Sequence, residues 1–182
     1  MTKVAVVFAE GFEEIEALSP VDVFRRAGFD CSMLGLESAS VTGSHGIQVA
    51  MDGVFDGSLD AYDLVVLPGG MPGSTNLRDN EGLITSLQAR NKAGKYIAAI
   101  CAAPIVLNHA GLLEGRKFTC FPGVEEQIAS GEHQTDLVVV DGNIITSRGA
   151  GTALAFAYAL VDLLGGDGQQ LAHTMVYDRL FK

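Results

Sequence analysis

The residue best placed to do chemistry in this sequence is a cysteine at the end of an apolar run. Residues 96–100 read Tyr-Ile-Ala-Ala-Ile, and Cys101, two alanines and Pro104 follow directly. This order predicts a buried strand that turns sharply into a helix, as at a nucleophile elbow. The unpaired N–H groups and positive dipole of a helix start favour a thiolate, so we expect a reactive Cys101. On this stretch alone, a core cysteine without chemistry is an equal alternative.

Two glycines follow another predicted strand and could complete a site around this cysteine. Gly69 and Gly70 come after the apolar run 64–67, where a backbone without side chains can approach a ligand closely. If Cys101 is a nucleophile, the N–H groups of Gly70 and Ala102 could stabilise an oxyanion on its substrate. A purely structural turn is the alternative for these glycines.

Glu16 is the candidate proton carrier. It ends an acidic stretch, residues 10–16, that follows the first predicted strand. The carboxyl ends of parallel strands share one crevice, so Glu16 and Cys101 are expected to lie close together. A carboxylate would repel a thiolate, so the pair is stable only if Glu16 keeps its proton and donates a hydrogen bond. Glu16 could then act as general acid or base, whereas helix capping explains most such acidic clusters.

The remaining candidate groups have weaker settings. Cys31 and Cys120 lack the strand-to-helix context and are predicted to be core thiols, and without a Cys-x-x-Cys pair they indicate no disulfide framework and no zinc site. Arg148 could supply a cation to the crevice or only help to cap a helix. None of the four histidines follows a strand end that would aim it at Cys101, so each is predicted to be solvated or packed. They are His45, His109, His133 and His173.

The elements that must position these residues alternate between strand and helix. Apolar runs at 4–8, 64–67 and 96–100 are typical of strands buried on both faces of a parallel sheet. Helical patterns from Ile15 to Phe24 and from Leu77 to Leu87 lie between them. The alternation predicts an α/β protein. Further expected elements are a strand at 31–36, a hairpin joining the segment near Val41 to 47–51, a helix at 104–111, a hairpin turning at Asp141-Gly142, and helices at 152–164 and 169–180.

Composition limits the class of protein. The 182 residues predict one domain, 1–182, and a chain with 48% hydrophobic and 19% charged residues should be globular. A net charge of −10 disfavours binding to nucleic acid. The longest apolar run, 96–107, is too short to span a bilayer, and no signal peptide is expected at the start. A cytoplasmic setting fits best.

Several motifs in order resemble the ThiJ/PfpI superfamily over nearly the whole chain. The resemblance implies a flavodoxin-like three-layer sandwich that forms a homodimer, in which residues near His45 approach the partner's site. It also implies that Cys101 is the reactive cysteine, that Glu16 is its protonated partner, and that Gly69, Gly70 and Ala102 line the oxyanion site. The motifs are Glu13-Glu14-Ile15-Glu16, Leu67-Pro68-Gly69-Gly70, Ala98-Ala99-Ile100-Cys101-Ala102 and Thr146-Ser147-Arg148-Gly149.

The sequence departs from the family at two informative positions. Phe121 stands where the animal branch has a histidine, and Ala102 stands where protease-like members have one. A Cys-His dyad from either position is therefore excluded, which counts against a peptidase.

We expect a cysteine enzyme of the glyoxalase or deglycase type that needs no cofactor and no metal. Its substrates would be reactive dicarbonyls such as methylglyoxal, converted to lactate, or their early adducts on protein and nucleotide groups. The alternative is a redox sensor or redox-regulated chaperone that works through oxidation of Cys101. Thiamin-precursor synthesis is a third reading, but the chain has no phosphate loop to support it.

Overall fold

A parallel sheet forms the centre of the molecule. The computed structural model describes residues 1–180, and the last two residues of the predicted domain, 181–182, lie outside that range. Within it, a seven-stranded sheet has the order β10-β11-β7-β6-β1-β2-β5, parallel throughout except for the β10–β11 hairpin. The strands are β1 (Lys3–Phe8), β2 (Asp30–Gly35), β5 (Gly53–Val54), β6 (Leu64–Leu67), β7 (Tyr96–Ile100), β10 (Val138–Asp141) and β11 (Ile144–Ser147).

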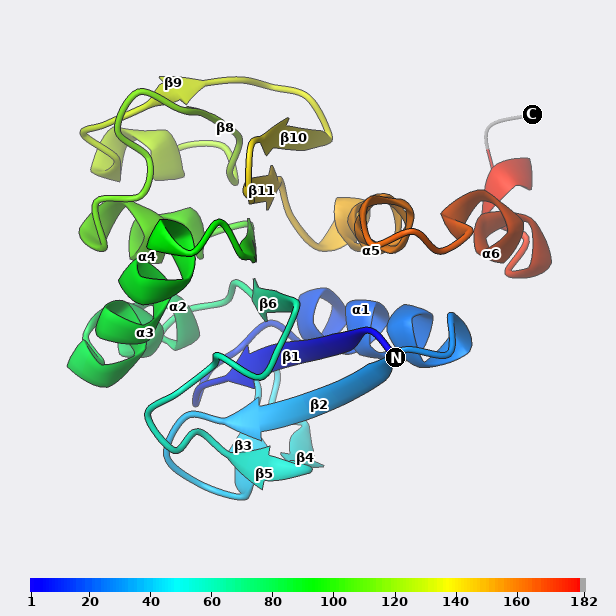
Figure 1. The fold of residues 1–182 in the computed structure, drawn as a ribbon, viewed down its shortest axis with the longest axis horizontal. Helices are drawn as coiled ribbons and strands as arrows, with labels where there is room; N and C mark the ends of the chain where they lie inside the picture. Colours follow the sequence, from blue (N-terminus) through cyan, green and yellow to red (C-terminus); the bar gives the residue numbers. More distant parts are fainter. Residues whose placement is uncertain (181–182) are drawn as a thin grey trace.

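Helices cover both faces of this sheet (Figure 1). One layer holds α1 (Glu14–Arg26) and α5 (Ala153–Leu163), with α6 (Gly168–Thr174) packed on α5. The other layer holds α2 (Gly73–Arg78), α3 (Glu81–Lys92) and α4 (Pro104–His109). The small elements are the hairpin of β3 (Ser40–Thr42) with β4 (Gln48–Ala50), the parallel pair of β8 (Lys117–Phe118) with β9 (Glu132–His133), and three 3-10 helices, η1 (Val124–Gln127), η2 (Ala150–Thr152) and η3 (Tyr177–Arg179).

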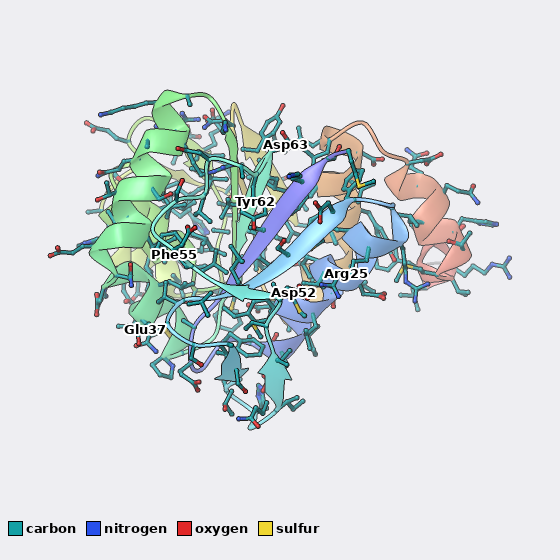
Figure 2. The ribbon with its side chains drawn as sticks, turned by 60° about the horizontal axis from the view of Figure 1, so that its bottom comes forward. Arg25, Glu37, Asp52, Phe55, Tyr62 and Asp63 are labelled. Carbon is teal, nitrogen blue, oxygen red and sulfur yellow. The ribbon has the colours of Figure 1, made fainter. Side chains whose placement is uncertain are left out.

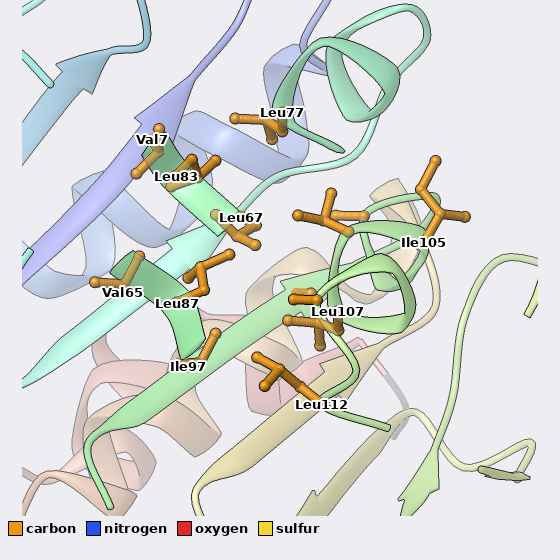
Figure 3. Packing of buried hydrophobic residues seen from close by; sticks show 14 of the residues in the cluster. Val7, Val65, Leu67, Leu77, Leu83, Leu87, Ile97, Ile105, Leu107 and Leu112 are labelled. Carbon is orange, nitrogen blue, oxygen red and sulfur yellow. The ribbon is translucent and has the colours of Figure 1, made fainter. Parts of the chain in front are cut away.

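Successive residues of the central strands pack into opposite layers. In β1, Val4 and Val6 pack with the α1–α5 layer, whereas Ala5 and Val7 pack with the α3–α4 layer. Because both faces are covered, every position must be apolar, which explains the continuous runs in the sequence. Figure 3 shows the α3–α4 layer, in which residues of α3 lie over those of β1, β6 and β7: Val7, Val65, Leu67, Leu83, Leu87 and Ile97.

The predicted α/β architecture is confirmed, but two predicted helices are interrupted. The pattern from Leu77 to Leu87 breaks where Asn80 caps α3 by accepting a hydrogen bond from the Leu83 N–H. The last predicted helix, 169–180, stops at α6 because Val176 adopts a left-handed conformation with φ of 65°. No helix among residues 1–180 is long and apolar enough to cross a membrane.

An ion pair holds the edge of the sheet to the first helix (Figure 2). The Arg25 guanidinium lies 2.6 Å from Asp52 Oδ2 and also donates to the carbonyl oxygen of Cys31. Asp52 accepts a further hydrogen bond from the Met33 N–H at 2.8 Å. These contacts tie the last turn of α1, β2 and the β4–β5 connection together, which fixes the end of α1 relative to the sheet.

Candidate active site

The loops after β1, β6 and β7 meet at the carboxyl edge of the sheet. The Glu13 N–H donates to the Gly69 carbonyl oxygen at 2.9 Å, and the Cys101 N–H donates to that of Ser147 at 3.1 Å. A Cβ atom built on Gly69 would clash with the carboxylate of Glu16 and lie 2.6 Å from the Cβ of Cys101. The structure therefore brings Glu16 and Cys101 together across a position that only glycine can occupy.

Cys101 sits in a strained turn between β7 and α4. Its φ is 65°, and among non-glycine residues 1–180 only Val176 shares a positive φ. Such a conformation costs about 1–2 kcal/mol for a residue with a side chain and is found most often at functional sites. Cys101 is also half-buried, whereas Cys31 and Cys120 are buried. The turn therefore presents the thiol of Cys101 at the strand tip, as a nucleophile elbow does.

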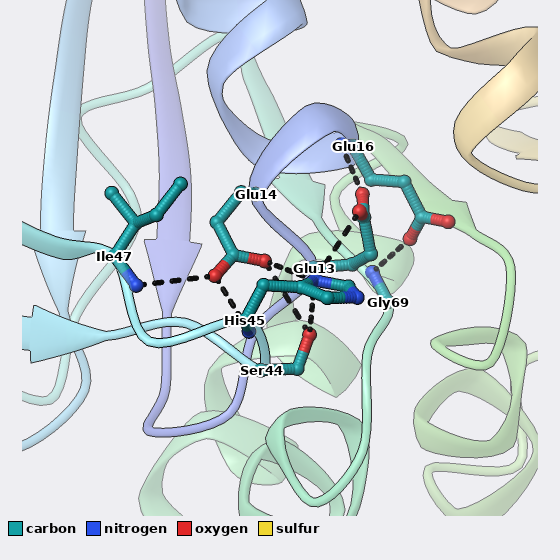
Figure 4. Close-up of polar contacts among 7 residues, drawn as sticks. All are labelled: Glu13, Glu14, Glu16, Ser44, His45, Ile47 and Gly69. Atoms are coloured by element: carbon teal, nitrogen blue, oxygen red, sulfur yellow. Dashed lines mark hydrogen bonds and ion pairs between the residues drawn. The ribbon is translucent and has the colours of Figure 1, made fainter.

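Glu16 is a buried acid that can hold a proton near neutral pH. Its residue is 1% exposed, and its Oε2 accepts a hydrogen bond from the Gly69 N–H at 3.0 Å (Figure 4). Burial raises the pKa of Glu16 to about 7, with a further contribution from the charge of Glu13, although hydrogen bonds to Cys101 and Gly69 oppose the rise. Protonated and ionised Glu16 are therefore both accessible close to pH 7, a property suited to a proton carrier.

The thiol of Cys101 differs from the expectation of a low pKa. Burial raises the pKa of Cys101, and the charge of the Glu16 carboxylate and a hydrogen bond to it raise the pKa further. The N–H groups of Gly70 and Ala102 lower it, but these donors do not outweigh burial. The N-terminus of α4 was expected to lower the pKa of this thiol, but its effect is smaller than that of burial. A protonated Glu16 removes the repulsive charge and can donate a hydrogen bond to the sulfur, which stabilises the thiolate.

The two glycines after β6 have different tasks. The N–H of Gly70 is directed at the Cys101 sulfur, as is that of Ala102, so both can face an oxyanion on a substrate carbon bonded to that sulfur. Gly70 has φ of 93°, and a Cβ there would lie 2.6 Å from the carbonyl carbon of Phe12. The Gly69 N–H instead binds Glu16. Gly69 was predicted to line the oxyanion site with Gly70 and Ala102, but its N–H instead positions the carboxyl group of Glu16.

Phe121 and Gly149 flank the pair. The Phe121 N–H donates to the Cys101 carbonyl oxygen at 2.9 Å, and its half-exposed ring lies 3.3 Å from where a Cβ of Gly149 would be. The same Cβ position is 3.9 Å from Glu16 Oε1. Gly149 thus lies against both the aromatic ring of Phe121 and the carboxyl group of Glu16.

Arg148 does not supply its cation to this crevice. Its guanidinium donates to the carbonyl oxygens of Cys120 at 3.4 Å and Thr135 at 3.3 Å. The Thr152 hydroxyl accepts the N–H groups of Arg148 and Gly149 at 3.2 and 3.1 Å. The guanidinium of Arg148 therefore joins the loops at Cys120 and Thr135, a structural role that differs from the predicted helix cap, whose contacts come from Thr152.

His45 belongs to a separate polar cluster at the start of α1 (Figure 4). Its Nδ1 lies 2.8 Å from Glu14 Oε2 and its backbone N–H donates to Glu14 Oε1, also at 2.8 Å. The hydrogen bond and charge of Glu14 raise the pKa of His45. No local sequence pattern indicates this pair, because the β3–β4 hairpin brings together residues 31 positions apart.

The fold and the cysteine–glutamate pair define a class of protein, a flavodoxin-like α/β sandwich with a cysteine at a strand tip. Solved structures with this fold include a mutant of a DJ-1 superfamily protein from Salmonella typhimurium, with a TM-score of 0.89 and 36% identity over 97% of this chain and 98% of that one. Drosophila melanogaster DJ-1beta has a TM-score of 0.89 and 35% identity over 96% and 97% of the two chains.

The chain belongs to the DJ-1/PfpI family, which matches residues 2–163. Protein dj-1beta of Drosophila melanogaster is 39% identical over 88% of both chains, and a deglycase of Pyrococcus horikoshii is 34% identical over 89% of this chain and 99% of its own. Protein DJ-1 homolog B of Arabidopsis thaliana is 38% identical over 90% of this chain, and this chain covers 38% of that longer protein.

Proposed function

We propose that this protein is a cysteine enzyme acting on reactive dicarbonyls or their early glycation adducts. The observation that carries the proposal is the contact between Cys101 and a buried Glu16 whose pKa is raised to about 7. Such a pair suits a reaction that adds a thiol to an aldehyde and then moves a proton. Relatives named deglycases, from Pyrococcus horikoshii and Thermococcus kodakarensis, are each 34% identical over 89% of this chain.

The first step with methylglyoxal is addition of the Cys101 sulfur to the aldehyde carbon. The new C–S bond forms as the thiol proton passes through Glu16 to the carbonyl oxygen, which gives a hemithioacetal. The N–H groups of Gly70 and Ala102 stabilise the negative charge on that oxygen during the addition.

Glu16 then moves a proton between the two carbons. As a carboxylate it removes the proton from the carbon bonded to sulfur, and as an acid it returns a proton to the neighbouring carbon, while the hydroxyl proton of the hemithioacetal moves to the former ketone oxygen. The product is a lactoyl thioester of Cys101. Water cleaves the thioester, which releases lactate and restores the thiol without any redox reagent.

The test is lactate formation from methylglyoxal in metal-free buffer. We expect the wild type to form lactate catalytically and Cys101→Ser, at equal folded concentration, to lose at least about a thousandfold in rate, since a covalent route then closes. Cys31→Ser, which changes a buried thiol outside the crevice, is the matched control and should retain activity. Lactate formation by Cys101→Ser at the wild-type rate would exclude the mechanism.

A redox function is the second candidate, favoured by the exposure of Cys101. It is the half-buried thiol, whereas the other two cysteines are buried. Oxidation would place sulfinate oxygens beside Glu16, which could donate a hydrogen bond to them when protonated. Oxidation-dependent suppression of client aggregation, lost in Cys101→Ser, would support this candidate. We also propose assembly as a homodimer, which sedimentation would test.

A further inference from the structure

A second cluster with a thiol lies outside the proposed active site. Cys120, Glu125 and His133 each offer a ligand atom, and these atoms all lie within 4.8 Å of one another. Cys120 follows β8, Glu125 belongs to η1 and His133 belongs to β9. Nothing in the proposed reaction uses these three side chains.

The backbone holds the three residues in place. β8 and β9 pair in parallel with Phe118 opposite His133, and the Gln134 N–H donates to the Phe118 carbonyl oxygen at 2.7 Å. The rings of Phe118 and His133 have centroids 5.6 Å apart. This pairing brings the imidazole close to Cys120, which is two positions after Phe118.

Glu125 is fixed by the turn that starts η1. Its Oε2 accepts a hydrogen bond from the Gly123 N–H at 2.7 Å, and the Cys120 Sγ lies 3.8 Å from the same oxygen. Gly123 adopts φ of 93°, a conformation that suits glycine and allows this short turn. The carboxylate is therefore oriented toward the sulfur before any ligand arrives.

One polar atom of the cluster has no partner. His133 Nε2 is buried and makes no hydrogen bond to any of residues 1–180. An unsatisfied buried nitrogen costs about 1–3 kcal/mol, and such a group calls for a ligand or a special role. Cys120 is itself fully buried, and the contact with Glu125 is the hydrogen bond that its thiol makes.

We propose that Cys120, Glu125 and His133 bind a zinc ion. A thiolate, an imidazole and a carboxylate are all ligands that Zn²⁺ accepts in tetrahedral sites, with water in the fourth position. One thiolate and one carboxylate neutralise the double positive charge. Glu125 and His133 are only partly buried, which leaves a path for the ion to enter.

Binding exchanges a proton for the metal. Zn²⁺ forms a bond to the Cys120 sulfur, and the thiol proton passes to solvent, so no oxidant or reductant is needed. The guanidinium of Arg148 donates a hydrogen bond to the carbonyl oxygen of Cys120, and its positive charge stabilises the thiolate of that residue. The bound ion would link the segment after β8 with η1 and β9. Phe121, the residue after Cys120, donates its N–H to the backbone of Cys101.

Cobalt titration of the full-length, metal-free protein tests this proposal. Co²⁺ replaces Zn²⁺ in such sites and gives a thiolate-to-cobalt absorption band that identifies a sulfur ligand. We expect one equivalent to produce the band and an equivalent of Zn²⁺ to remove it, whereas Mg²⁺, which prefers oxygen ligands, should not. Cys120→Ser should abolish the band, and Glu125→Gln should weaken Zn²⁺ binding at least about tenfold.

Matched variants separate this site from other thiols. Cys31→Ser and Glu126→Gln, which change a buried cysteine and an exposed glutamate, should bind as the wild type does. Circular dichroism confirms that each variant is folded. His133→Gln should also weaken Zn²⁺ binding at least about tenfold. Should this variant not fold, the chemical shift of the His133 ring nitrogens in the wild type, which Zn²⁺ should change, replaces this measurement. Absence of the band, or a band lost in Cys101→Ser but kept in Cys120→Ser, would overturn the proposal.

Discussion

The molecule contains two cysteine–glutamate pairs whose environments differ. Cys101 contacts Glu16, and Cys120 contacts Glu125 at 3.8 Å. In both pairs, burial and the neighbouring carboxylate raise the pKa of the thiol. The carboxyl groups behave in opposite ways, because burial raises the pKa of Glu16 to about 7, whereas hydrogen bonds from its own N–H and that of Gly123 hold the pKa of Glu125 below its usual value.

This difference shows that contact between a thiol and a carboxylate does not by itself make a proton relay. Glu16 is a buried residue of α1, and its pKa of about 7 makes both protonation states accessible near neutral pH. Glu125 is only half-buried and stays ionised, so it cannot pass a proton to a reacting carbon. A permanent carboxylate suits a cation. The same two residue types thus have environments that suit the proposed proton transfer in one place and the proposed metal binding in the other.

The largest expected effect that tests this contrast is on turnover. Glu16→Gln keeps an N–H donor toward Cys101 but cannot exchange a proton, so we expect turnover of methylglyoxal to fall by about 10²-fold or more. Alkylation of Cys101 by iodoacetamide, followed by mass spectrometry, should be at least as fast as in the wild type, since the amide carries no negative charge. Glu126→Gln is the matched control at an exposed glutamate. Unchanged turnover in Glu16→Gln would remove this residue from the mechanism.

The pH dependence of stability should show the cost of burying Glu16. A folded-state pKa of about 7 lies above the ordinary 4.5, so the folded protein binds more protons between these values, and its stability falls as pH rises through them. The loss amounts to about 3 kcal/mol and is complete above the folded-state pKa.

Urea unfolding at about pH 5 and about pH 8 measures this loss, and Glu16→Gln should lack most of it. The other titrating groups remain in the variant, so the difference between the two proteins isolates Glu16. Parallel profiles for the wild type and the variant would show that Glu16 has no raised pKa.

The smallest expected effect is a difference in oxidation rate among the thiols. Cys101 is half-buried and the other cysteines are buried, so mild peroxide should oxidise Cys101 about tenfold faster, which corresponds to about 1.4 kcal/mol in activation free energy. Peptide mass spectrometry with time gives the rate for each residue. Glu16→Gln should preserve this order, since exposure sets it. Equal rates at Cys31, Cys101 and Cys120 would mark Cys101 as an ordinary core thiol.

Local sequence was sufficient for much of the framework. The runs at 4–8 and 64–67 identify strands covered on both faces, and Asp141-Gly142 identifies the β10–β11 hairpin, because tight turns and buried strands depend on neighbouring residues. Helix ends were harder to predict from the sequence. The helix break at Val176 depends on a left-handed backbone conformation, which the identity of a non-glycine residue does not indicate.

The sequence by itself determined that Cys101 directly follows a central strand and that Glu16 lies in the first turn of a helix after another central strand. It also indicated that the two residues lie at one edge, because parallel strands direct their carboxyl ends to the same edge of the sheet. The tertiary structure alone decided how these groups titrate, since a pKa depends on burial and on partners far along the chain, such as Gly69 for Glu16. It also decided the cluster of Cys120, Glu125 and His133, which depends on the pairing of two strands of two residues each. Strands that short leave no periodic pattern in a sequence.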